Sequence, residues 1–260
     1  MRRGLAVTLS ALAFAGTARA ATPCPAAARV EANLPAWRAA LQQADTAARR
    51  DELLGAVGLS LDAPDGVRVT FLGADDLAVQ TEPDARPDHV VHARFSVGNA
   101  GDEAMIHLVQ VLRPLEGRKW CALGDGLSRS DDGARRLVGY ELAFVPLLAA
   151  RGKALELRVS TSELRRNETR HEYWTTAAGK LRKVFDELTG SMDSSETGAP
   201  TTTKIGKLAL AGAFPKRIEL TEVTKRGGCE AHAGDTPCDD SEPSTTFTFI
   251  YDGTKYIRKK

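Results

Sequence analysis

The stretch Leu155-Glu-Leu-Arg-Val-Ser160 alternates apolar and polar side chains with a period of two. This period is typical of a β-strand that buries one face. An apolar run at residues 141–149 precedes it, and the turn residues 151–153 separate the two. A polar reversal around Asn167 follows, and the chain returns through further short apolar segments as far as Phe185. The pattern predicts an antiparallel β-meander.

The rest of the chain after residue 58 has the same character. Asp252-Gly253 is a strong signal for a hairpin turn, with the return strand at residues 255–257. Further strands are expected at residues 67–72, 89–97, 105–112, 120–123, 205–210, 214–224 and 245–251. Residues 189–203, rich in Thr, Ser and Gly, are expected to form a long loop or a mobile excursion. The predicted fold class is mainly β, with antiparallel meander or sandwich-like sheets and an N-terminal α-helical segment.

The helical segment is expected within residues 26–54, which are rich in alanine. Asn33 is a candidate cap, Pro35 suits the first turn, and Gly55 is a plausible stop. An apolar stripe lies on one helical face, and we expect it to pack on a sheet rather than on a partner. Its members are Trp37, Leu41, Ala44 and Ala48.

The N-terminus predicts export. Two arginines, an apolar stretch too short to span a membrane and a small-residue site ending at Ala20 form a secretory signal peptide at residues 1–20. We expect cleavage after Ala20 and a periplasmic or secreted protein, and no later apolar run is long enough to span a bilayer. Residues 1–20 contain three arginines and no acid, so their removal takes the formal charge from +1 to −2. A chain without basic excess is not expected to bind nucleic acid.

The remaining chain divides by composition into three parts. Residues 21–58 form the helical segment, residues 59–127 a first β-rich half, and residues 137–260 the C-terminal β-meander. A loop at residues 124–136, rich in Gly, Ser and Asp, separates the two halves. The length allows one large domain or two small ones.

Four cysteines in an exported chain predict two disulfides. We favour the pair Cys229–Cys238, which flank one short loop, and then Cys24–Cys121 by default. The loop between Cys229 and Cys238 and the residues after it are acidic, and we consider it a possible contact loop. Its candidate contact residues are Glu230, His232, Asp235, Asp239 and Asp240. A solvated loop that the disulfide makes rigid is nevertheless the favoured interpretation, because oxidising compartments convert such cysteine pairs to disulfides. A metal at His232 is a further alternative, but it requires reduced cysteines or ligands from elsewhere.

Other candidate sites are weaker. His89 and His92 lie three apart, which on a strand places them on opposite faces and prevents joint chelation. His107, inside an apolar strand, is expected to be a hydrogen-bonded sheet residue. Phe247, Phe249 and Tyr251 share one strand face. We expect this face to belong to the core of a sandwich rather than to line a groove for a ligand.

No nucleophile elbow, zinc-protease motif, phosphate loop or dinucleotide fingerprint occurs, and no cofactor is predicted. We therefore favour a non-enzymatic binding or structural module of the cell envelope, with an unknown protein or envelope polymer as its partner. The alternative is a small secreted hydrolase that uses carboxylates, with or without a metal at the His232 loop. Convergent active sites leave no sequence trace, so this alternative stays open.

Overall fold

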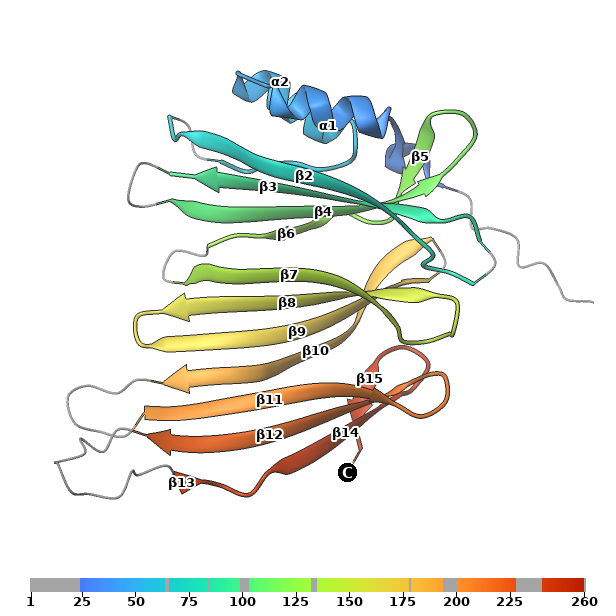
Figure 1. Cartoon of the computed structure of the whole chain (residues 1–260). Helices are drawn as coiled ribbons and strands as arrows, with labels where there is room; N and C mark the ends of the chain where they lie inside the picture. The colour runs from blue at the N-terminus through green and yellow to red at the C-terminus, as the bar shows by residue number, and fades with distance from the viewer. Residues whose placement is uncertain are drawn as a thin grey trace, which may run out of the picture.

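The computed structural model describes residues 24–63, 66–83, 85–98, 103–131, 135–177, 179–193, 201–227 and 240–259. Two antiparallel sheets and a small helical layer make up this part of the chain, and the predicted fold class is confirmed (Figure 1). Neither described α-helix has the length and apolar character that a membrane span requires.

The first sheet has the strand order β1-β5-β4-β3-β2, and β6 pairs with the remaining edge of β4. Its strands are β1 (Arg29–Glu31), β2 (Val69–Val79), β3 (Asp88–Val97), β4 (Ala104–Pro114), β5 (Lys119–Ala122) and β6 (Leu127–Arg129). On β3 and β4, apolar side chains are buried on both faces of the strand, at odd-numbered and at even-numbered positions. This sheet is therefore covered on both faces, which explains why its strands have nearly continuous apolar runs.

The second sheet has the order β15-β14-β12-β11-β10-β9-β8-β7, and β13 adds to the end of β12. Its strands are β7 (Arg136–Pro146), β8 (Lys153–Glu163), β9 (Arg166–Ala177), β10 (Lys180–Asp193), β11 (Thr201–Ala211), β12 (Arg217–Gly227), β13 (Asp240–Ser241), β14 (Thr245–Tyr251) and β15 (Tyr256–Arg258). Strands β7 to β12 follow one another as neighbours, so the predicted meander is confirmed. The chain passes from one sheet to the other between β6 and β7, inside the loop expected to separate the halves.

The helical layer comprises the helices α1 (Leu34–Gln42) and α2 (Ala47–Gly55), and the 3-10 helix η1 (Ala26–Ala28) precedes it, with Ala28 packed on the cluster between the sheets. Asn33 caps α1 by accepting a hydrogen bond from the backbone N–H of Ala36, as its sequence position predicts. The expected helical region is interrupted, however, because Thr46 caps a second helix. As a result, Ala48 is exposed and does not belong to the buried stripe.

Three clusters of buried side chains hold these layers together. The first lies between the helices and the first sheet and includes Trp37, Leu41, Leu54, Phe95 and Leu108. The second joins the two sheets and includes Val90, Val109, Leu155, Leu157 and Val159. The third belongs to the second sheet and includes Tyr173, Phe185, Ile218, Leu220 and Phe249. Phe247 and Tyr251 pack against this third cluster, so the core interpretation of the aromatic face is confirmed.

A disulfide and a polar network fix the connections around the first sheet. The expected bridge between Cys24 and Cys121 is present, and it ties the start of the described chain to β5. Asp88 is buried and accepts two hydrogen bonds from the Arg113 guanidinium, at 3.0 and 3.1 Å. The hydroxyl of Thr81 donates to Asp88, and Thr176 of β9 donates to Thr81. This network therefore links the β2–β3 connection to β4 and to the second sheet.

Two predicted loop positions differ from the structure. The reversal between β8 and β9 occurs at Leu164 and Arg165, and Asn167 lies inside β9 instead of in the turn. Leu164 has a φ of 45°, a left-handed conformation that leucine rarely adopts. A leucine in the sequence therefore does not indicate a turn at this position. Likewise, β10 continues to Asp193 and β11 begins at Thr201. Residues 189–193 and 201–203 of the expected loop therefore belong to strands.

Candidate functional site

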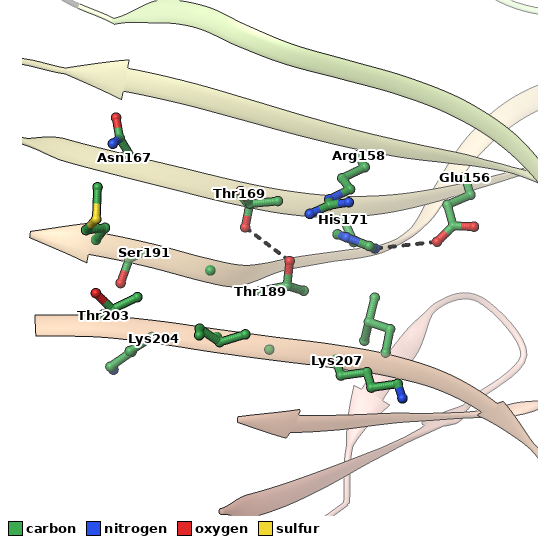
Figure 2. A pocket seen from close by; sticks show the side chains of 15 residues that line it. Glu156, Arg158, Asn167, Thr169, His171, Thr189, Ser191, Thr203, Lys204 and Lys207 are labelled. Carbon is green, nitrogen blue, oxygen red and sulfur yellow. Dashed lines mark hydrogen bonds and ion pairs between the residues drawn. The ribbon is translucent and has the colours of Figure 1, made fainter. Parts of the chain in front are cut away.

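A groove of about 470 Å³ lies on the second sheet, across β8, β9, β10 and β11. Figure 2 shows Asn167, Thr169 and His171 in a row along β9, with side chains of β8 beyond them and β11 across the groove. The row spans four residue steps of a strand, or about 14 Å. A chain of a few extended units would fit along it.

The period of two explains why β8 contributes polar side chains to the groove, whereas Met192 on β10 and Ile205 and Leu208 on β11 give the opposite wall an apolar lining. On β8, Leu155, Leu157 and Val159 point into the core between the sheets. The alternate residues Glu156 and Arg158 therefore face the other way, toward the groove. On β9 the register places Tyr173 opposite Glu156 and His171 opposite Arg158.

Glycines shape the floor of the groove. Gly190 follows a register shift in β10 and stands opposite Ile205 of β11, and it leaves the floor without a side chain there. Gly206 is required by packing, because a Cβ there would lie 2.4 Å from the backbone oxygen of Thr189 and 2.8 Å from Leu220. The close approach of β10 and β11 therefore depends on that glycine.

One carboxylate lines the groove, and it is held inside a local contact network. The hydroxyl of Tyr173 donates to Glu156 at 3.0 Å. The Nδ1 atom of His171 lies 3.4 Å from the same oxygen, too long for a well-formed hydrogen bond, so this contact is chiefly electrostatic. The His171 contact, assisted by Tyr173, lowers the pKa of Glu156 although burial opposes the change. Glu156 is therefore an anion at neutral pH and is unsuited to donate a proton as a general acid.

A second polar cluster lies between the sheets and is not open to the groove. The Nε2 atom of His92 on β3 lies 3.0 Å from Nδ1 of His107 on β4. The ring of Tyr140 on β7 stacks on His107 with a centroid distance of 4.1 Å and lies tilted against His92 at 5.4 Å. Burial is the main cause that lowers the pKa of each histidine to about 4, so both are neutral at pH 7. The Tyr140 hydroxyl is buried and has no hydrogen-bond partner among the described residues, and its pKa is raised by burial.

An ion pair closes the space between β6 and the second sheet beside this cluster. Arg129 donates to both oxygens of Glu172, at 2.9 and 2.7 Å, and the indole N–H of Trp174 donates to Glu172 at 2.8 Å. The side chain of Glu172 is only 7% exposed. Removing it would therefore leave two donors without their acceptor.

The variant Glu172→Ala is expected to lower the free energy of unfolding by about 3 kcal/mol, since it leaves the Arg129 guanidinium partly buried and unpaired. Urea unfolding followed by tryptophan fluorescence measures the change. Glu52→Ala is the matched control, because the Arg49–Glu52 pair is exposed and is expected to contribute less than about 1 kcal/mol. Equal effects of the two substitutions would show that Arg129 finds solvent or another partner in the variant.

The residues predicted for the contact loop mostly cannot be placed against the groove. Glu230, His232, Asp235 and Asp239 lie outside the described residues, as do Cys229 and Cys238. Asp240 begins β13, where its backbone is in register with Arg226 on β12. The contact loop and the pair Cys229–Cys238 therefore stay predictions.

Of the three histidines considered from the sequence, His89 and His92 do not share a partner. His89 contacts Asp76 at 2.7 Å and meets the Trp120 ring edge to face, whereas His92 and His107 contact each other. His107 is therefore the hydrogen-bonded sheet residue that the sequence predicts. Within the described ranges, no group of three or more His, Cys, Asp or Glu side chains is placed to hold a metal ion.

Sequence reasoning missed the groove itself. Its residues on β8 and β9 were visible only as the polar half of an alternating pattern, which is normally the solvent face. Comparisons with protein-family models, with curated proteins and with solved structures find no significant match to this chain. Any functional assignment therefore depends on the chemistry of the groove.

Proposed function

We propose that the protein is an exported, non-enzymatic binding module that holds an extended polar polymer of the cell envelope in the groove of the second sheet. The observation that carries this proposal is the groove, whose lining combines hydroxyl-bearing side chains and Asn167 with the apolar side chains of Met192, Ile205 and Leu208. Export is supported by the signal-peptide pattern of residues 1–20.

The composition of the lining favours binding over hydrolysis. Cleavage of a glycosidic bond ordinarily requires two carboxyl groups, one of them a proton donor. Among the described residues that line the groove, Glu156 is the single carboxylate, and its lowered pKa keeps it ionised. The hydrolase alternative would therefore need a proton donor from outside the lining, either Glu187, which stands opposite His171 and whose pKa is raised by burial, or a residue that is not described, such as Asp235 or Asp239.

The variant Gly190→Val tests the site. A Cβ at Gly190 would meet its neighbours at 3.5 Å or more, an ordinary contact distance, so the strand tolerates a side chain there. Valine would fill the floor of the groove without altering charge. We expect a ligand found on an array of soluble polysaccharides and peptides to bind this variant at least about tenfold more weakly than the parent.

Thr245→Val on β14 is the control, because it places the same side chain on an exposed strand position away from the groove lining. Thermal unfolding of both variants checks that the fold is retained. Ligands that bind Gly190→Val as tightly as the parent would place binding elsewhere. Turnover of any array polymer would replace the binding proposal with the hydrolase alternative.

A further inference from the structure

The groove opens where two neighbouring strands of the second sheet separate. Strands β10 and β11 pair only through residues 190–193 and 202–205. Beyond these residues the strands separate, and Figure 2 shows them diverging on the side of Lys207. We call this opening the fork. Within the described part of the chain, residues 206–211 of β11 pair with β12 on one side and with no strand on the other.

The lining shows that the groove meets β11 along its edge. Successive residues of a strand point to opposite faces, so a groove that lies on a sheet face touches every second residue. This holds on β9, where Asn167, Thr169 and His171 line the groove. On β11, by contrast, the consecutive residues 204–208 all line it. The groove therefore lies over the face of β9 and against the backbone edge of β11.

The hydrogen bonds of the neighbouring strands identify the backbone groups at this edge. The backbone oxygen of Thr248 on β14 accepts a hydrogen bond from the residue after β15, so Thr248 bonds away from β12. In an antiparallel ladder the direction of bonding alternates from residue to residue. Glu219, the partner of Thr248 on β12, therefore bonds to Ala209 on β11. Leu208 and Leu210, on either side of Ala209, direct their N–H and C=O groups the other way, into the fork.

A free strand edge restricts the chemistry of the ligand. Another extended polypeptide backbone offers N–H and C=O groups at the spacing that such an edge requires. Charge does not select a ligand of one sign, because Arg158 and Glu156 both line the floor and Glu187 stands opposite His171. The described lining also contains no aromatic side chain on which a sugar ring could stack. The edge therefore favours a polypeptide over a sugar polymer.

Apolar side chains lie beside the fork, at the end where β10 and β11 are still paired. Met192 and Ile205 line the groove there and are 40% and 50% exposed. Exposed apolar surface gains free energy when a ligand covers it. A bound segment that carries aliphatic residues is therefore favoured.

We propose that the groove binds an extended polypeptide segment that adds as a strand to the free edge of β11. The segment pairs with the backbone of Leu208 and Leu210, and its side chains on one face contact Thr169 and His171. This inference rests on the proposed function and identifies the bound polymer as a polypeptide.

The first test uses synthetic peptides of about eight residues, long enough to span residues 206–211 and composed of Val, Ile, Thr and Ser, which favour extended backbone. Calorimetric titration of the full mature chain identifies the tightest of them, and dextran and polygalacturonate of similar mass serve as sugar probes. We expect N-methylation of alternate central amides to weaken binding of that peptide at least about tenfold, and N-methylation of the amides between them to weaken it less than about twofold. Only every second N–H group of an added strand faces β11.

Amide hydrogen exchange then locates the added strand on the protein. In the free chain we expect Lys207 and Ala209 to exchange slowly, because they bond to β12, and Leu208 and Leu210 to exchange faster. Saturation with the tightest peptide should slow Leu208 and Leu210 at least about tenfold. Strand β7, at the other end of the same sheet, is the internal control and should be unchanged.

Each other outcome contradicts a separate part of the argument. Peptide binding that N-methylation leaves unchanged, or weakens equally at all positions, would overturn strand addition, and Gly190→Val then shows whether the groove is still the site. Protection of β7 in place of Leu208 and Leu210 would overturn both this inference and the groove. If no peptide binds, the polypeptide class is overturned. A sugar probe whose binding Gly190→Val weakens would in that case keep the proposed function.

Discussion

Between pH 7 and pH 4 the protein is expected to lose on the order of 5 kcal/mol of its free energy of unfolding through the protonation of two histidines. In an unfolded chain a histidine titrates near pH 6.5. In the folded protein the pKa values of His92 and His107 are lowered to about 4, chiefly by burial. Between these values the unfolded chain binds more protons than the folded one, so a fall in pH favours unfolding.

The surroundings of the pair explain why neither histidine accepts a proton easily. Arg94 lowers both pKa values through its charge, Asp75 partly opposes this for His92, and the two rings lie against Tyr140. A proton on one ring would place a charge 3.0 Å from the other. The stability that the neutral pair contributes is therefore present above pH 6.5 and is lost as the pH falls toward 4.

Urea unfolding at half-unit pH steps measures this loss. The double variant His92→Phe, His107→Phe keeps aromatic rings beside Tyr140 and is expected to show a much flatter profile between pH 6.5 and pH 4. His89→Gln is the control and is expected to keep the slope of the parent, because His92 and His107 remain. A parent profile as flat as that of the phenylalanine variant would show that the pair titrates in the folded protein as it does in water.

The sequence predicted those features that depend on local pattern. The period of two located the meander, Asp252-Gly253 located the β14–β15 hairpin, and the stripe of Trp37 and Leu41 located the helical face that packs on the first sheet. Each of these is set by neighbours within a few residues. The break between α1 and α2 was missed because capping by Thr46 competes with a strong alanine preference for helix.

The groove could not be predicted because it results from long-range geometry. Arg158 and His171 become neighbours only through the β8–β9 register, and β11 completes the groove only because it approaches β10 at Gly206. Neither the register nor this approach is visible in the alternation of polar and apolar residues. The acidic loop attracted attention instead, since its charges are adjacent in sequence.

The disulfide is expected to have the other large effect, and its removal in the variant Cys24→Ala should cost about 4 kcal/mol of unfolding free energy. The two cysteines are 97 residues apart, and closing a loop of that length removes much of the conformational entropy of the unfolded chain. The closed loop includes both helices and strands β1 to β4. In the folded protein these elements are already held by the first core and by the pairing of β1 with β5, so the cross-link acts mainly on the unfolded state.

Two comparisons separate the cross-link from the volume of the sulfur atoms. Cys24→Ala keeps the buried Cys121 side chain in place, whereas Cys24→Ala, Cys121→Ala removes it, and we expect similar losses from both because the cross-link dominates. The urea dependence should also steepen, since an unfolded chain without the bridge exposes more surface. If Cys24→Ala costs less than about 1 kcal/mol and leaves that slope unchanged, the bridge does not restrain the unfolded chain. Any additional loss when a reductant is added to the double variant would then belong to the predicted pair Cys229–Cys238, the two cysteines that remain.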